Sequence, residues 1–235
     1  MSALTAPLTA MPILWLALTL GVWLAAIEIQ KRSGNRVMAN PVLLTIVAIG
    51  ALLLACHIPY ATYWQGTQAI NLLLGPATIA LAVPMVRHIA RIGKSLRGMG
   101  LALLAGSLTS MVSAMVLVGA LGGSRSVMLS MAPKAATTPI AMGVAAQVGG
   151  IPALTAALAI ASGILAALIG KTLLSALGIE DRAIHGFSAG VAGSGIAVAQ
   201  VTRLGEVATA FGALGIALNG VMTSVLLPCV LAVFP

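Results

Sequence analysis

The sequence GMGLALLAGSLTSMVSAMVLVGAL occupies residues 98–121 and contains no charged side chain. A helix needs about 20 mainly apolar residues to span the hydrocarbon core of a bilayer, so this stretch predicts a transmembrane helix. The whole chain has the same character, because 60% of its 235 residues are hydrophobic and only 7% are charged. A soluble domain carries about 25% charged residues. We therefore predict an all-α, polytopic integral membrane protein.

Seven further segments have an apolar composition that suits a membrane, which gives about eight in all. They cover residues 11–29, 41–58, 70–86, 127–148, 151–170, 186–201 and 207–235. The segments at 70–86, 127–148 and 186–201 are the irregular ones, since proline, lysine or repeated glycine interrupts them. We predict that residues 1–235 form a single helical bundle with broken helices.

The net charge of +8 reflects basic loops rather than a nucleic-acid interface. Cytoplasmic loops of membrane proteins carry an excess of Lys and Arg. Lys31 and Arg32 follow the first segment and a basic cluster at residues 87–97 follows the third, so both are predicted inside, with the N-terminus outside. Arg125, Lys171 and Arg182 are expected on the outer side. The predicted location is the inner (plasma) membrane, with the lipid bilayer as a partner.

The two halves of the chain resemble each other. Residues 8–121 and 124–235 are the predicted repeats; Pro41 aligns with Pro152, and Thr109-Ser110 aligns with Thr223-Ser224. Duplicated halves are typical of secondary transporters. Four crossings in each half would make the repeats parallel, whereas inverted repeats would require one re-entrant segment in each half. The sequence leaves both arrangements open.

The clearest chemical signal is a polar break in the fifth segment. Pro133 and Pro139 each remove a backbone donor that a helix interior needs, and Lys134, Thr137 and Thr138 lie between them. A charged side chain at membrane depth is costly and marks a functional site by default. We predict an anion site in which the lysine supplies charge and a half-helix supplies N–H donors. The alternative is a lysine that extends to the membrane interface beside an ordinary proline kink.

Two other places are predicted to be broken helices that line the same site. Residues 186–195 contain repeated glycines, each of which costs a helix about 1 kcal/mol relative to alanine. Ser194 and Gln200 are the candidate polar residues there. Pro76 and Thr78 are the candidates at the related position of the first half. The alternative for both places is close helix packing through small residues.

The sequence offers no residues for an enzyme or a resident cofactor. No metal-ligand cluster, nucleotide-binding loop or Ser/His/Asp set is visible, so we expect no catalysis and no cofactor. Glu28, Glu180, Asp181 and Glu206 all lie at segment ends or in loops. A carboxylate relay for protons or sodium therefore has no evident residue, although coupling to either ion stays open.

Several motifs carry a family resemblance that extends over nearly the whole chain. They are Asn40-Pro41, residues 74–84 (LGPATIALAVP), Pro133-Lys134 with Thr137-Thr138-Pro139-Ile140-Ala141, residues 149–152 (GGIP) and residues 223–228 (TSVLLP). In these motifs the chain resembles the LrgB/CidB family, which includes the membrane domain of the plastid glycolate/glycerate translocator. The family carries a motif like Ser-His-x-x-Gly-Thr-Ala where residues 193–199 here read GSGIAVA. Ser194 thus stands at the histidine position and Val198 at the threonine position, which puts the family's substrate or ion coupling in doubt for this chain.

The resemblance implies two competing functions. One is a carrier for small 2-hydroxy monocarboxylates such as glycolate and glycerate, which we expect to work by alternating access of an elevator-like kind, as a homodimer. The other is an antiholin-like regulator of murein hydrolase export and cell lysis. A third reading is a membrane scaffold that transports nothing. We favour the carrier, because neither a hole-forming protein nor a scaffold needs paired broken helices with a buried lysine.

Overall fold

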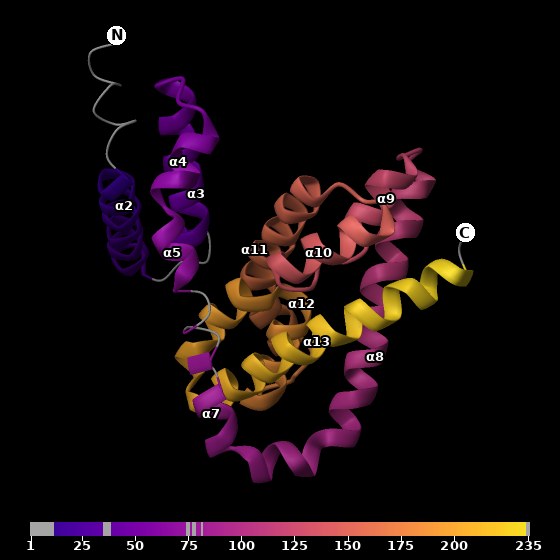
Figure 1. Cartoon of the computed structure of the whole chain (residues 1–235). Coiled ribbons are helices and arrows are strands. Elements are labelled where there is room, and N and C mark those ends of the chain that lie inside the picture. The colour runs from indigo at the N-terminus through magenta and orange to yellow at the C-terminus, as the bar shows by residue number, and fades with distance from the viewer. Residues whose placement is uncertain (1–11, 35–38, 74–75, 77–78, 81, 234–235) are drawn as a thin grey trace. The chain divides into compact units, whose positions relative to one another are not determined.

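The structure, a computed structural model, describes residues 12–34, 39–73, 76, 79–80 and 82–233, and this part of the chain contains helices and no strand (Figure 1). Among these described residues, five helices are long and apolar enough to cross a membrane. The predicted all-α class is thereby confirmed, and the five candidate spans support the predicted membrane protein. The predicted count of eight segments and the twofold repeat are not confirmed. By its internal contacts, the chain divides into two compact units, residues 1–80 and 81–235.

Unit 1, residues 1–80, contains α2 (Pro12–Arg32), α3 (Pro41–Ala55), α4 (Tyr60–Gly66) and α5 (Gln68–Leu72). Asn40 caps α3, because its side-chain oxygen accepts a hydrogen bond of 2.8 Å from the backbone N–H of Val42. Pro41 occupies the first turn, where its missing N–H costs nothing. The Asn-Pro pair therefore fixes the start of this helix.

Trp15 holds unit 1 together. Its side chain is 1% exposed and meets the ring of Tyr63 edge-on, with the ring centroids 5.6 Å apart. Gly66 leaves room for the indole, since a β-carbon at this position would lie 2.6 Å from Trp15 Cδ1. The packing of α4 against α2 thus depends on the indole of Trp15 lying directly against Gly66.

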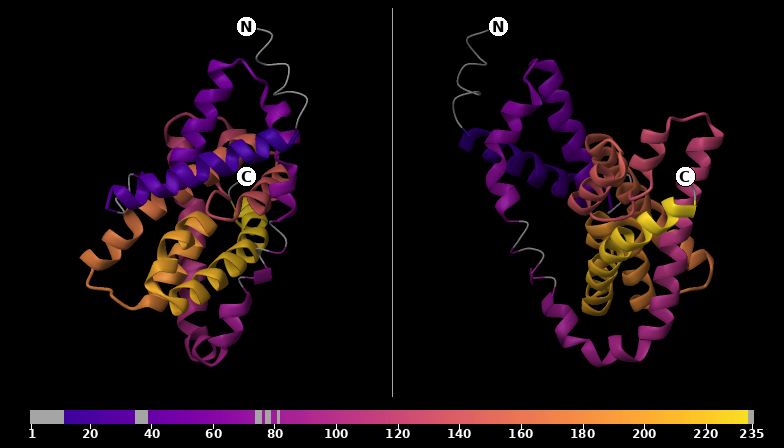
Figure 2. Two further views of the ribbon diagram at one scale, coloured as in Figure 1. Left: turned by 90° about the vertical axis from the view of Figure 1, so that its left-hand side faces the viewer. Right: turned by 45° about the vertical axis from the view of Figure 1, so that its right-hand side comes forward.

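Unit 2, residues 81–235, contains seven α-helices among its described residues, with one short 3₁₀ turn (η2, Thr202–Leu204). They are α7 (Ala82–Arg87), α8 (Ile89–Ala120), α9 (Arg125–Met131), α10 (Thr138–Val148), α11 (Pro152–Ala176), α12 (Arg182–Val201) and α13 (Glu206–Val233). Helix α8 is bent, and its first turns run across one end of unit 2 (Figure 1). That end lies opposite α9 in each view (Figure 2). We call it the basic end, because α7 and the first turns of α8 carry Arg87, Arg91 and Lys94.

Helices α9 and α10 form hairpin 1. After α10 the chain comes back beside α9, because the backbone N–H of Ile151 donates a hydrogen bond of 2.7 Å to Oγ of Ser130 in α9. Thr155 Oγ1 donates a bond of 3.0 Å to the Ser130 carbonyl and fastens the hairpin to α11. The tip between the two helices reaches deeper along α11, where Ala136 packs against Ala159. Residues 127–148 are therefore a reversal, not the single crossing that the sequence predicts.

Helix α12 is also a hairpin, hairpin 2. Ser194 has φ 52° and ψ −146°, which breaks the helix into a first arm (182–193) and a second arm (195–201). A β-carbon on Gly212 of α13 would lie 2.9 Å from Val198 and 3.3 Å from the Gly186 carbonyl. In a straight helix, residues 186 and 198 would be about 18 Å apart. The second arm must therefore fold back beside the first.

Glycines let hairpin 2 lie against α13. A β-carbon on Gly190 would clash with the Gly212 carbonyl, and one on Gly215 would lie 2.7 Å from the Phe187 carbonyl. These contacts bring two backbones together, as small residues do between membrane helices. The alternative interpretation of the glycine-rich stretch, close packing, therefore holds for the first arm. The predicted break holds at Ser194.

The hairpins change the expected sidedness of two basic residues. The sequence predicts Lys171 and Arg182 on the side opposite residues 87–97. In the structure Asp181 is the N-cap of α12, and its Oδ2 lies 3.5 Å from Nη2 of Arg91. Lys171 is in the last turns of α11, the helix that leads to Asp181. Lys171 and Arg182 therefore belong to the basic end, because hairpin 1 turns back and does not cross from one end of unit 2 to the other. Arg125 begins α9 at the other end.

Candidate functional site

Lys134 lies in the tip of hairpin 1 and is half-buried. Its ammonium donates hydrogen bonds of 2.9 Å to the Ser110 carbonyl and 3.0 Å to Ser110 Oγ. Ser110 is within α8, far from both of its ends. A lysine ammonium has three protons, so one donor remains for a ligand. The side chain is thus directed toward α8 inside unit 2.

The tip of hairpin 1 also presents the start of a helix. Thr137 is the N-cap of α10 and Pro139 lies in its first turn. No hydrogen bond is formed by the hydroxyl groups of Thr137 or Thr138 within the described residues, and both side chains are half-buried. The first N–H groups of a helix have no partner inside it. This tip therefore offers an ammonium, two hydroxyl groups and free backbone donors close together in the chain.

Asn219 of α13 connects the two hairpins. Its amide nitrogen donates hydrogen bonds of 3.0 Å to the Ala135 carbonyl in hairpin 1 and 3.1 Å to the Val191 carbonyl in hairpin 2. Its amide oxygen accepts a bond of 2.8 Å from Ser107 of α8. The side chain is 1% exposed. One amide thus ties four elements together beside the tip that carries Lys134.

The tips of the two hairpins contact α11 one helical turn apart. Gly193 approaches α11 so closely that a β-carbon on Gly163 would lie 3.0 Å from its carbonyl. Hairpin 1 meets the same helix at Ala159. One turn of a helix is about 5.4 Å long. The two hairpins therefore enter unit 2 from opposite ends, and their tips contact neighbouring turns in the first half of α11.

Ion pairs hold the basic end together. Arg87 bonds to Glu206 at 3.2 Å and Arg91 to Asp181 at 3.5 Å, which joins α7 and α8 to the starts of α13 and α12. All four side chains are about half exposed or more, so the pairs fix geometry more than they stabilise the fold.

Comparison with known proteins identifies the family. The sequence model of the LrgB-like family matches residues 19–233, which is nearly the whole chain. The chain belongs to the LrgB-like family. The described fold is thus that of an LrgB-like protein in which two helical hairpins meet inside the second unit.

Relatives of this LrgB-like chain match it over most of both sequences. The Bacillus subtilis protein YxaC is 31% identical over 94% of this chain and 96% of its own. A Haemophilus influenzae protein is 30% identical over 89% of this chain and 90% of its own. The Bacillus mycoides protein named antiholin-like protein LrgB is 30% identical over 84% of this chain and 86% of its own. No solved structure matches the chain.

The positions where this LrgB-like chain departs from the family motif have different surroundings. Ser194, at the position of the family's histidine, is the tip residue of hairpin 2 and is half-buried. Val198, at the position of the threonine, is 3% exposed and packs against α13. A threonine side chain at residue 198 would therefore lie in the contact between hairpin 2 and α13.

The remaining predicted site residues are not all brought to Lys134. Gln200 is next to Val201, which packs on Ala208 near the start of α13, so it lies at the base of hairpin 2 and not at its tip. Pro76 is an exposed residue of unit 1. Thr78 lies outside the described residues. A role for Pro76 and Thr78 stays a prediction.

Sequence reasoning missed Ser107, Ser110 and Asn219. The signal was present, because a lone asparagine in the long apolar segment 207–235 is a buried polar group that must find partners. Ser107 and Ser110 were hidden among other small polar residues of α8, and nothing in their spacing distinguishes the inward-facing ones.

Proposed function

We propose that this LrgB-like protein is a membrane carrier for small 2-hydroxy monocarboxylates of the glycolate and glycerate type. The observation that carries the proposal is the ammonium of Lys134, which Ser110 holds inside unit 2 while its third proton has no partner among the described residues. An unpaired cation in that position is costly to maintain. An anionic ligand would neutralise it.

The donor set suits a hydroxy acid. A carboxylate has two acceptor oxygens, and a 2-hydroxyl group both donates and accepts. Lys134 and the N–H groups at the start of α10 would bind the carboxylate, aided by the helix dipole. The hydroxyl groups of Thr137 and Thr138 are available for the 2-hydroxyl group, and Ser194 is a further candidate from hairpin 2. Desolvating a carboxylate requires that nearly all its hydrogen bonds be replaced.

The paired hairpins favour transport over hole formation. Broken helices that meet near mid-membrane are a recurring way to build a binding site in secondary transporters. Unit 2 contains Lys134 and both hairpins, whereas unit 1 is a separate compact body. We propose alternating access of an elevator-like kind with unit 2 as the moving part, in a homodimer located in the inner membrane with the basic end in the cytoplasm. We propose no enzymatic activity and no cofactor.

The second candidate is an antiholin-like regulator of murein hydrolase export and cell lysis. Its support is the name of several Bacillus relatives, antiholin-like protein LrgB. A regulator of this kind would act through other membrane proteins and would need no substrate site.

Uptake into liposomes distinguishes the two candidates. Purified protein reconstituted into liposomes should accumulate labelled glycolate or glycerate against unlabelled substrate trapped inside, and Lys134→Ala should abolish the uptake. A reconstituted protein that carries neither compound, while its loss changes lysis in cells, would favour the regulator and exclude our proposal.

A further inference from the structure

A cavity of about 850 Å³ lies in unit 2 between α8 and the first arm of hairpin 2. Arg91 and Lys94 line it toward the basic end, and Ser110 lines it at the other end of its length along α8. The stretch from Arg91 to Ser110 represents about 28 Å of helix. Ser110 also binds the ammonium of Lys134, so the cavity runs from the basic end to the side chain that holds this ammonium.

Small residues of α8 leave this space open. Gly98, Ala102 and Gly106 all line the cavity. A β-carbon on Gly98 would meet nothing within 4 Å, and one on Gly106 would meet only Val191, at 3.5 Å. In contrast, Gly190 in the first arm of hairpin 2 lies in backbone contact with α13. The small residues of α8 therefore provide room and do not bring two helices together.

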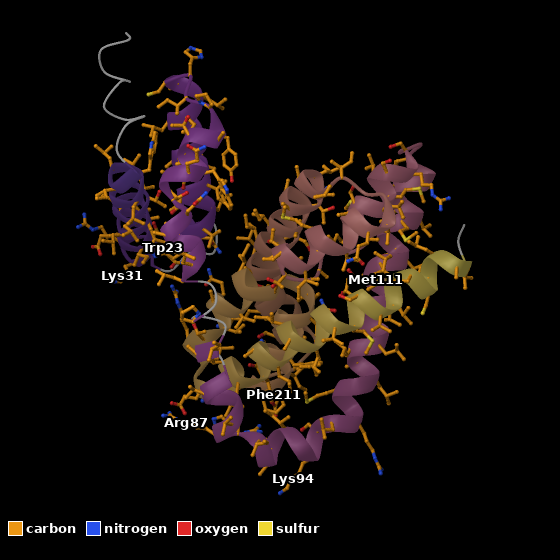
Figure 3. All side chains as sticks on the ribbon, viewed as in Figure 1. Trp23, Lys31, Arg87, Lys94, Met111 and Phe211 are labelled. Carbon is orange, nitrogen blue, oxygen red and sulfur yellow. The ribbon has the colours of Figure 1, made fainter. Side chains whose placement is uncertain are left out.

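The charge at the mouth favours anions. Arg91 is paired with Asp181. No ion pair is formed by Lys94 within the described residues, and its side chain projects at the edge of the basic end (Figure 3). The mouth therefore has one uncompensated positive charge. Farther in, Met99, Phe187 and Phe211 make the wall apolar.

Beyond Ser110 the path is closed. Met111 (2% exposed) and Met115 of α8 pack with Ala132 and Val144 of hairpin 1 and with Leu227 of α13 (0% exposed). These side chains fill the interior between Lys134 and the end of unit 2 that carries Arg125. The cavity therefore reaches Ser110 from the basic end and stops at this packed cluster.

We propose that the cavity is a one-sided, water-filled vestibule that binds organic monoanions with an apolar body and admits smaller ones to Lys134 from the basic end. Lys94 attracts the charged group, and the wall around Met99 and Phe187 contacts the apolar part. The delivery of anions to Lys134 rests on the proposed function, whereas the vestibule itself is inferred from the cavity and its charge.

Cysteine modification tests the vestibule in membrane fragments that are open on both sides. In a chain with Cys56→Ala and Cys229→Ala, Ala102→Cys should react with the anionic reagent sulfonatoethyl methanethiosulfonate. The matched control is Leu101→Cys, because Leu101 is 71% exposed but does not line the cavity and would face lipid. It should not react. Gly98→Cys is the second vestibule variant if Ala102→Cys folds poorly.

Charge selectivity is the second readout. The rate with the anionic reagent divided by that with cationic trimethylammonioethyl methanethiosulfonate should be several-fold higher at Ala102→Cys than for a free thiol in solution. Lys94→Gln should lower this ratio, and octanoate should slow the anionic reaction more than glycolate does.

Two results would overturn the vestibule: vestibule cysteines as unreactive as Leu101→Cys, or a reaction without anion preference. If the anion-selective reaction occurs but liposomes carry neither glycolate nor glycerate, the vestibule stands and the proposed substrates are wrong.

Discussion

Asn219 and Ser107 are 112 residues apart in the chain and are joined by a buried hydrogen bond of 2.8 Å. The same amide also bonds to the Ala135 and Val191 carbonyls, so α8, α13 and both hairpins share one polar side chain. In a membrane interior no water can replace these bonds. The arrangement of the two hairpins depends on this residue.

Asn219→Ala should therefore lower the free energy of unfolding in detergent by about 1–2 kcal/mol, because two carbonyl groups lose their donor. Val221→Ala is the control, since Val221 is on the same helix and 65% exposed. A thermal unfolding midpoint that falls equally for both variants would show that the amide does not hold the hairpins.

The packing of hairpin 2 on α13 predicts that two glycine-to-alanine substitutions differ in their effect on stability. Gly190→Ala should lower the thermal midpoint, at a cost of about 1–3 kcal/mol, because the added methyl group meets the Gly212 carbonyl. Gly100→Ala should cause no loss, since nothing lies within 4 Å of its β-carbon. Equal tolerance of the two substitutions would contradict the close contact.

Backbone strain at the tip of hairpin 2 predicts that Ser194→Gly stabilises the protein. A non-glycine residue at φ 52° and ψ −146° is strained, and relief should be worth about 1 kcal/mol. Ser194→Ala removes the hydroxyl group but keeps the strain, so it should not stabilise. The thermal midpoints of the two variants decide whether the reversal is at this residue; a higher midpoint for the alanine variant would argue against it.

The hairpin topology predicts the sidedness of two loops. Ser124 precedes hairpin 1 and Glu180 precedes hairpin 2, with only α11 crossing between them. In the Cys56→Ala, Cys229→Ala background, Ser124→Cys should react with an impermeant thiol reagent added to intact cells, and Glu180→Cys should react only in inside-out vesicles. Reaction of both cysteines from the same side would mean that residues 127–148 cross the membrane.

Much of this fold follows from composition and local chemistry. The apolar run at residues 98–121 and the near absence of charge suffice for a helical membrane protein. Pro133, Lys134 and Pro139 predict the interruption between α9 and α10, because proline removes donors wherever it stands. The Asn40-Pro41 pair predicts the start of α3 for the same kind of local reason.

The reversals could not be predicted in this way. An apolar segment with a polar break can continue across the bilayer or turn back, and both satisfy local rules. Contacts far apart in sequence decide between them, such as Ser130 with Ile151 and Gly212 with both arms of hairpin 2. The pairing of Lys134 with Ser110 is equally non-local, so the sequence identified the lysine but not its partner.

The central claim is that Lys134 is the counter-charge of a bound hydroxy acid. Its direct test is the affinity of the purified, folded protein for glycolate and glycerate, compared among the parent, Lys134→Ala and the control Lys171→Ala. Loss of the buried charge partner should weaken binding by about 2–5 kcal/mol, which is roughly 30-fold to several thousand-fold, while Lys171→Ala should bind like the parent. Lys134→Ala protein that binds either hydroxy acid as tightly as the parent would contradict the account.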